Sequence, residues 1–210
     1  AKLVLFELGM ANDRVGHTAL RVLVNRSVGP TFFPDDVMQA SIALQHHPLT
    51  GDASYLRASS IRLQLEPEKR EEILADAIER LAKREKVLLA VWLNTVLAPT
   101  LVTKLLPVSE AVTDETKFQP LFQALLLLKR TTDARQLRKQ ADEILGERAK
   151  LQSAAYLELA EGERVEAFPR FVRNAANSGD QQLLVDAGRL AMLAGRGEES
   201  WNAYLQALEA

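Results

Sequence analysis

The sequence contains no cysteine, which excludes disulfides, thiolate catalysis and cysteine-ligated zinc. It also lacks a long hydrophobic run. The longest stretch without a charged residue begins at Val87 and contains Asn94 and Pro99, and it is shorter than the roughly 20 apolar residues of a membrane span. We therefore expect no direct membrane insertion, and a soluble protein of the cytoplasm or the periplasm.

A strong charge of one sign is absent as well, because the formal net charge is only −2. No basic excess of the kind that nucleic acid binding requires is present, so we expect no nucleic acid partner. Apolar residues make up 47% of the chain, charged residues 26%, and glycine is scarce with 10 residues. This composition supplies a core and favours helices, which predicts an all-α fold.

Residues that carry catalysis or bind metals are few. The only histidines are His17, His46 and His47, and the last two are adjacent, so on a helix they would point about 100° apart. The chain has no glycine-rich phosphate loop and no GxSxG nucleophile elbow. We therefore expect no enzyme activity, no cofactor and no metal site.

What the sequence does contain is an internal repeat. Aligned at a constant offset of 33 residues, Leu184 corresponds to Leu151 and Phe118, and Tyr204 corresponds to Phe171. A period of this size in helical sequence is typical of a repeat array. The period is clearest over 114–210 and degenerate over 1–110, and we predict a single elongated domain over 1–210.

Capping and breaking residues predict the helix boundaries. Asn12 or Asp13 caps a helix over 14–25, and Pro34 starts a helix that ends near His46. The further predicted elements are a helix opened by Asp52 or Ser54 and ended by Pro67, its partner to Leu81, a helix through Val87 and Trp92, a short helix from Pro99 to near Pro107, and hairpins over 115–144, 147–177 and 181–209.

Two prolines fall inside the predicted repeat helices. Pro120 fits if its helix begins close to Lys117, because the amides of a first turn lack partners within the helix. Pro169 predicts a kink or a late helix start.

The repeat resembles the tetratricopeptide repeat, a helix-turn-helix unit of about 34 residues. With Leu184 at the fourth position of the unit, Gly188 stands at the eighth, Ser200 at the twentieth and Tyr204 at the twenty-fourth. Small residues at the eighth and twentieth positions let the two helices approach. The resemblance implies a right-handed α-α superhelix, a solenoid of about six helix hairpins.

The resemblance also implies a binding groove on the concave face, lined by the first helix of each hairpin. The polar residues at the groove positions are Lys86, Asn94, Gln119, Gln123, Gln152, Tyr156, Gln182 and Arg189. This row is rich in amides, which donate and accept hydrogen bonds and so suit a peptide backbone. The alternative is that these residues are simply the solvated faces of amphipathic helices.

A basic cluster forms a second candidate surface, made of Lys129, Arg130, Arg135, Arg138 and Lys139. It could receive an acidic segment or a phosphate, or it could be a solvated face, which is the commoner role of such a run.

Both ends of the sequence are apolar, with Leu3 and Phe6 near the start and Trp201 and Leu208 near the end. A free-standing array closes with polar-faced helices, so we expect a segment of a longer repeat protein, or ends that pack on each other or on a second copy. The leading hypothesis is a non-enzymatic scaffold that binds a partner protein or peptide. The alternative is a structural module that self-associates through its terminal helices.

Overall fold

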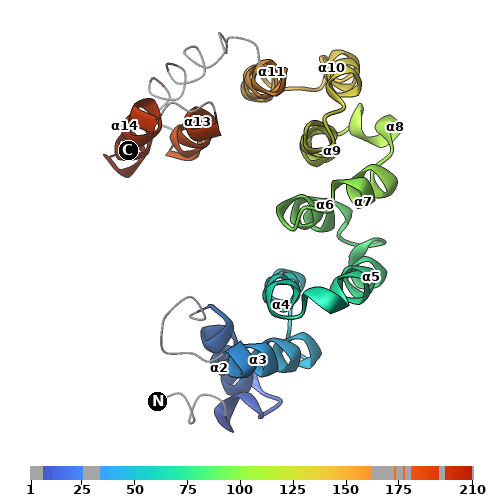
Figure 1. Cartoon of the computed structure of the whole chain (residues 1–210), viewed down its shortest axis with the longest axis vertical. Coiled ribbons are helices and arrows are strands. Elements are labelled where there is room, and N and C mark those ends of the chain that lie inside the picture. The colour runs from blue at the N-terminus through green and yellow to red at the C-terminus, as the bar shows by residue number, and fades with distance from the viewer. Residues whose placement is uncertain are drawn as a thin grey trace. The chain divides into compact units, whose positions relative to one another are not determined.

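The computed structural model describes residues 7–25, 34–161, 173, 177, 181–193 and 197–209. Within these residues every regular element is a helix and no strand occurs, which confirms the all-α prediction. The contacts divide the chain into two compact units, residues 1–98 and 99–210, and each unit is described separately below (Figure 1).

Unit 1 is built from helices that each contact the next one along the chain. They are α2 (Arg14–Asn25), α3 (Pro34–His46), α4 (Asp52–Leu65), a 3₁₀ turn (Pro67–Lys69), α5 (Arg70–Leu81) and α6 (Lys86–Thr95). The first starts where it does because the Asp13 carboxylate accepts the N–H groups of Val15 and Gly16, both at 2.9 Å. In α3, proline occupies the first position and acidic residues fill the first turn, where they suit the helix dipole.

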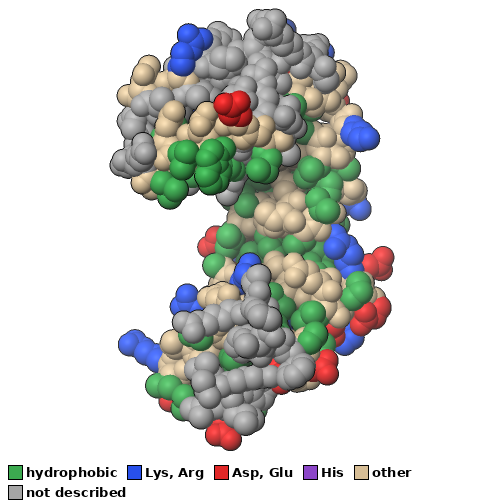
Figure 2. All heavy atoms as spheres, turned by 60° about the vertical axis from the view of Figure 1, so that its left-hand side comes forward, with side chains coloured by type: hydrophobic (Ala, Val, Ile, Leu, Met, Phe, Trp, Pro, Cys, Tyr) green, Lys and Arg blue, Asp and Glu red, His purple; other side chains and the backbone are tan. Residues whose placement is uncertain are grey.

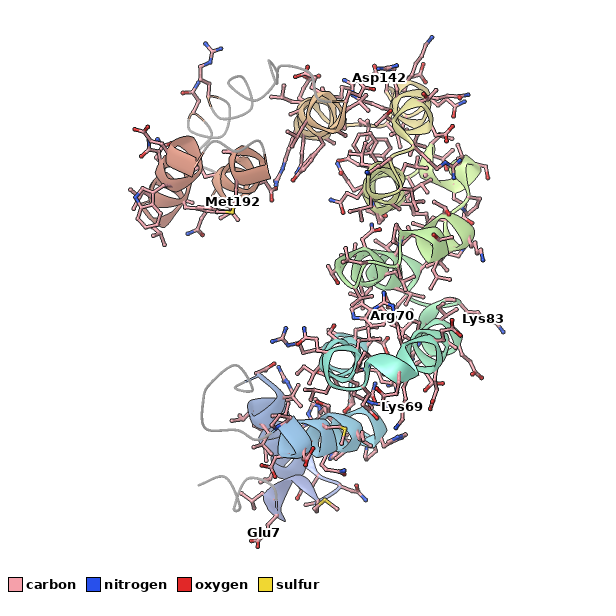
Figure 3. The ribbon with its side chains drawn as sticks, in the orientation of Figure 1. Glu7, Lys69, Arg70, Lys83, Asp142 and Met192 are labelled. Atoms are coloured by element: carbon pink, nitrogen blue, oxygen red, sulfur yellow. The ribbon has the colours of Figure 1, made fainter. Side chains whose placement is uncertain are left out.

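The core of unit 1 joins α2, α3 and α4. Its buried members are Leu20, Leu23, Val24, Val37, Ala40, Leu44, Ala58 and Ile61. Beyond this core, polar side chains attach α6. The Trp92 indole N–H donates to the Ser60 hydroxyl of α4 at 2.8 Å, and Arg70 donates from the start of α5 to the Val96 carbonyl at 2.6 Å (Figure 3).

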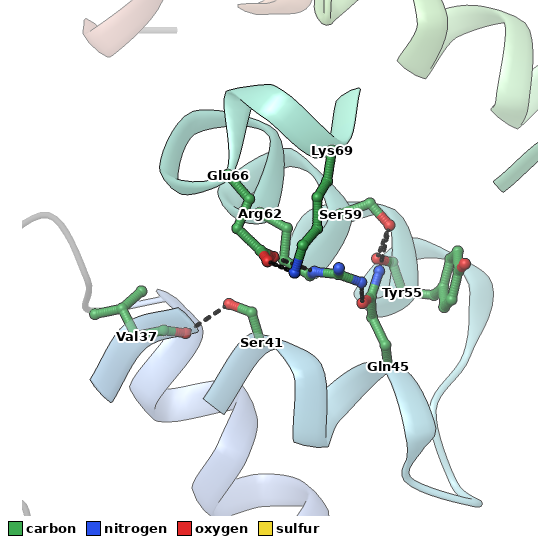
Figure 4. A network of polar contacts seen from close by, with 8 residues as sticks. All are labelled: Val37, Ser41, Gln45, Tyr55, Ser59, Arg62, Glu66 and Lys69. Atoms are coloured by element: carbon green, nitrogen blue, oxygen red, sulfur yellow. Dashed lines mark hydrogen bonds and ion pairs between the residues drawn. The ribbon is translucent and has the colours of Figure 1, made fainter. Parts of the chain in front are cut away.

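An ionic network around the buried Glu66 carboxylate closes the junction between α4 and the 3₁₀ turn (Figure 4). The Glu66 carboxylate accepts from the Lys69 ammonium at 2.6 Å and from the Arg62 Nε at 2.8 Å. Arg62 also donates to the Gln45 side-chain oxygen at 2.8 Å, and the Gln45 amide donates to Ser59 at 2.7 Å. The hydrogen bond from Lys69, followed by that from Arg62, lowers the pKa of Glu66. The carboxylate therefore stays ionised and ties the end of α4 to α3.

Unit 2 contains the helices that carry the clear repeat. They are α7 (Pro99–Leu105), α8 (Val108–Ala111), α9 (Glu115–Leu127), α10 (Thr131–Gln140), α11 (Glu147–Ala160), α13 (Gln181–Leu193) and α14 (Gly197–Glu209). Helix α9 contacts α7, α8, α10 and α11. It contributes the stacked rings of Phe118 and Phe122, which are fully buried with centroids 5.3 Å apart.

Small residues form the core among α11, α13 and α14. Ala155, Ala187, Ala191 and Ala203 are buried together. A Cβ added to Gly188 would lie only 2.8 Å from the ring of Tyr204, so glycine lets α13 and α14 approach closely. The small residue at the eighth repeat position therefore has the packing role that the resemblance implies for it.

Two helices end in the same backbone turn. Leu97 after α6 and Lys129 after α9 have positive φ values of 57° and 58°. In each turn the following amide reaches back five residues, from Ala98 to the Leu93 carbonyl and from Arg130 to the Leu125 carbonyl, both at 2.8 Å. This bond is the mark of a Schellman helix end, here without the glycine that such ends usually carry.

Most predicted helix boundaries are confirmed, including Arg14–Asn25 and Pro34–His46. The prediction for Pro120 is wrong, because α9 begins at Glu115 and includes this proline in its second turn. The reason is the cap, since the Asp114 carboxylate accepts the Thr116 N–H at 3.0 Å and fixes an early start. The predicted short helix from Pro99 to near Pro107 is confirmed as α7, and a further short helix, α8, follows Pro107. Pro169 lies outside the described residues.

Candidate partner-binding site

Amide side chains form a row along α9 and α11. Gln119 and Gln123 are one helical turn apart on α9, and Gln152 and Tyr156 are one turn apart on α11. Gln123 is exposed and the other three are half-buried. Residues four apart share a helix face, so each helix presents one polar pair on one side.

Polar links join the helices along these same faces. Glu115, one turn before Gln119, accepts the N–H of Gly146 at the start of α11 at 3.1 Å. Arg148, one turn before Gln152, pairs with Asp186 of α13 at 2.7 Å. Helix α11 contacts both α9 and α13, so the first helices of successive hairpins are neighbours. Sequence reasoning missed Glu115 and Arg148, although their spacing of four residues from the glutamines was visible.

Tyr156 differs from the glutamines because it packs against the alanine core of α11, α13 and α14. It is half-buried, so its ring is fixed by the helices below it. An aromatic ring held in this way keeps little rotamer freedom to lose on binding. Its substitution would also disturb the core, so Tyr156 is unsuitable as a test of binding alone.

The other predicted groove residues divide into two groups. In unit 1, Lys86 is half-buried at the start of α6, whereas Asn94 near its end is 7% exposed. Asn94 therefore belongs to the interior of its unit and is not an open contact residue. Gln182 and Arg189 lie in α13, but their side chains are outside the described residues.

The arginines of the predicted basic cluster interact with different side chains. Arg130 pairs with Asp133 at 2.7 Å and Arg135 pairs with Glu161 at 2.5 Å. Arg138 instead turns toward α11, where its Nε donates to the Ser153 hydroxyl at 3.1 Å. Lys129 and Lys139 are exposed. The cluster is therefore not one continuous surface.

The histidines have structural contacts. His47 accepts the Leu49 N–H at Nδ1 and contacts the Ala11 carbonyl through Nε2, both at 3.1 Å, so Nε2 carries the proton. The His17 ring lies 5.2 Å from that of His47, and burial, then His47 and Arg21, lower the pKa of His17. In the part of the chain that the structure describes, no cluster of three metal-ligating side chains occurs.

Across the described helices, none is long and apolar enough to cross a membrane. Comparison with protein-family models, curated proteins and solved structures gave no match. The resemblance to tetratricopeptide repeats stays a prediction from the sequence.

Proposed function

We propose that this chain is a non-enzymatic scaffold with a tetratricopeptide-like superhelical arrangement, and that it binds an extended segment of a partner protein along the amide row of α9 and α11. The observation that carries this proposal is that Gln119 and Gln123 lie one turn apart on α9, and Gln152 lies on α11, which contacts α9. Each amide donates and accepts hydrogen bonds, as does a peptide backbone. The half-buried ring of Tyr156 adds a rigid apolar contact beside them.

Peptides selected from a display library for binding to the chain provide the test. The double variant Gln123→Ala and Gln152→Ala should weaken their binding about thirtyfold, because two net hydrogen bonds of about 1 kcal/mol each are lost. Affinity is measured by fluorescence anisotropy with labelled peptide, and circular dichroism verifies that the helices are retained.

The matched control is the double variant Gln136→Ala and Gln140→Ala, which removes two exposed amides from α10. It should leave the affinity unchanged. Equal binding by the two double variants would contradict a site on the α9 and α11 row.

Self-association is the second candidate function, favoured by an apolar face on α14. Trp201, Leu205 and Leu208 are 64%, 40% and 80% exposed and follow one helix face. Exposed hydrophobic side chains are seen together in the upper part of Figure 2. Contiguous apolar surface of this kind is typical of an interface.

The proposed occupant of this face is a second copy of the chain, at an apolar groove on α2. That groove has a volume of about 390 Å³, and its lining residues are Leu8, Arg14, Val15, Thr18, Ala19 and Val22. The exposed Glu198 at the start of α14 offers the complementary charge.

Light scattering over a concentration series tests the second candidate. The mass should rise with concentration for the parent chain, and Trp201→Ser with Leu208→Ser should weaken the association at least tenfold, as for interface anchors. A parent chain that stays monomeric throughout the series would remove this candidate and leave the peptide scaffold.

A further inference from the structure

A second pocket lies on unit 2, between α10 and α11. Its volume is about 580 Å³, and its described lining residues are Arg138, Glu147, Lys150, Leu151, Ala154, Arg173 and Asn177. This volume is in the range of small-molecule sites, roughly 300–1,000 Å³. The described lining combines three cationic side chains, one carboxylate and one amide with two apolar residues of α11.

The Arg138 guanidinium is oriented toward this pocket by hydrogen bonds to uncharged groups. Its Nε donates to the buried Ser153 hydroxyl at 3.1 Å, and one Nη donates to the Lys150 carbonyl at 3.4 Å. Among the described residues, no carboxylate forms an ion pair with Arg138. A half-buried guanidinium held in place without a carboxylate keeps donors for an anion, and its fork suits a phosphate.

Among the residues that the structure describes, Glu147 lines the pocket and Asp142 pairs with one of its lining residues, and both carboxylates are exposed. Asp142, which follows α10 on the side of α11 (Figure 3), lies 3.3 Å from the Lys150 ammonium, with a side chain that is 57% exposed. Of the described cations in the lining, Arg138 is held by hydrogen bonds to uncharged groups, so its guanidinium offers charge-assisted donors to an anion.

We propose that this pocket binds a phosphate group, either as free phosphate or as a phosphate monoester. Arg138, Lys150 and Arg173 surround the phosphate, and Asn177 supplies an amide donor. For a monoester, Leu151 and Ala154 offer an apolar surface to the organic part. Donors from α10, from α11 and from the segment of Arg173 and Asn177 suit a tetrahedral anion better than a planar carboxylate. This site is separate from the amide row and does not depend on it.

Isothermal titration of the full chain with three probes tests the proposal. Phenyl phosphate should bind at least tenfold more tightly than benzoate, which has the same ring and a planar carboxylate. If inorganic phosphate binds as tightly as phenyl phosphate, the site takes the free anion. If inorganic phosphate binds more weakly, the site takes a phosphate monoester. Two results would overturn the proposal. One is equal affinity for phenyl phosphate and benzoate, and the other is no binding of either phosphate at a concentration on the order of 20 mM, where even weak anion sites are occupied.

Charge variants locate the binding. Arg138→Gln should weaken phenyl phosphate binding about tenfold, as expected for one charge-assisted contact. Because Arg138 also joins α10 to α11, Lys150→Gln is measured in parallel and should weaken binding by a similar factor. Asp142→Asn should strengthen it about threefold, since a competing carboxylate is removed.

The matched control is Lys139→Gln, which removes an exposed cation next to Arg138 in sequence but outside the pocket. Its affinity for phenyl phosphate should equal that of the parent chain. A loss of affinity in Lys139→Gln as large as in Lys150→Gln would show that binding follows net charge, and would refute a site at this pocket.

Discussion

Replacing Phe118 with alanine should lower the free energy of unfolding by about 4 kcal/mol, the usual cost of removing a large ring from a core. Phe118 has no exposed surface and stacks on Phe122. Helix α9, on which both rings lie, contacts α7, α8, α10 and α11, so the cavity would face several neighbours at once. Urea unfolding followed by circular dichroism measures the loss.

Leu127→Ala is the control for this substitution, because it removes an apolar side chain from the same helix at a position that is 48% exposed. It should cost less than about 1 kcal/mol. If Phe118→Ala costs no more than Leu127→Ala, then α9 is not the central helix of its unit.

Replacing Gly16 with alanine should destabilise unit 1 by about 3 kcal/mol, within the range of overpacked sites. A Cβ at this position would lie 1.8 Å from the Ala11 carbonyl oxygen and 3.0 Å from that of Leu8. Both obstacles are backbone atoms, so no side-chain rotation relieves the clash. The added methyl group would therefore displace residues 8–11 from α2.

Chemical denaturation measures this effect, and limited proteolysis should show faster cleavage between residues 7 and 13. The control is Gly51→Ala before α4, where an added Cβ meets no atom within 4 Å. Its stability should fall by no more than about 1 kcal/mol, the usual cost of alanine at an N-cap position. If Gly16→Ala and Gly51→Ala lose similar stability, then the contact of Gly16 with the backbone of Leu8 and Ala11 does not explain the need for glycine there.

The helix boundaries could be predicted because the signals that set them are local. Asp13 and Pro34 act within one turn of their own positions. Pro120 could not be placed by the same reasoning, since the Asp114 cap outweighs the loss of one amide in the second turn. The helix therefore begins where the Asp114 cap places it, although Pro120 then lacks one hydrogen bond of the second turn.

The candidate sites were predicted less completely, because they depend on side chains distant in sequence. The repeat placed Asn94 at a groove position, but packing within unit 1 buries it. The basic cluster was visible as a run of charges, yet the partners that divide it, Ser153 and Glu161, lie on a later part of the chain. A periodic pattern identifies equivalent positions and does not identify which of them a neighbouring helix covers.

The turns after α6 and α9 have a consequence for how this repeat can diverge. Leu97 and Lys129 are chemically unrelated, and the residues beside them also differ, yet the two backbones close with the same bond over five residues. The turn is therefore specified by main-chain geometry that tolerates side-chain replacement, at a cost of roughly 1 kcal/mol for each residue that is not glycine. Side chains can therefore be replaced at these two turns while the backbone hydrogen bond that closes each helix is kept.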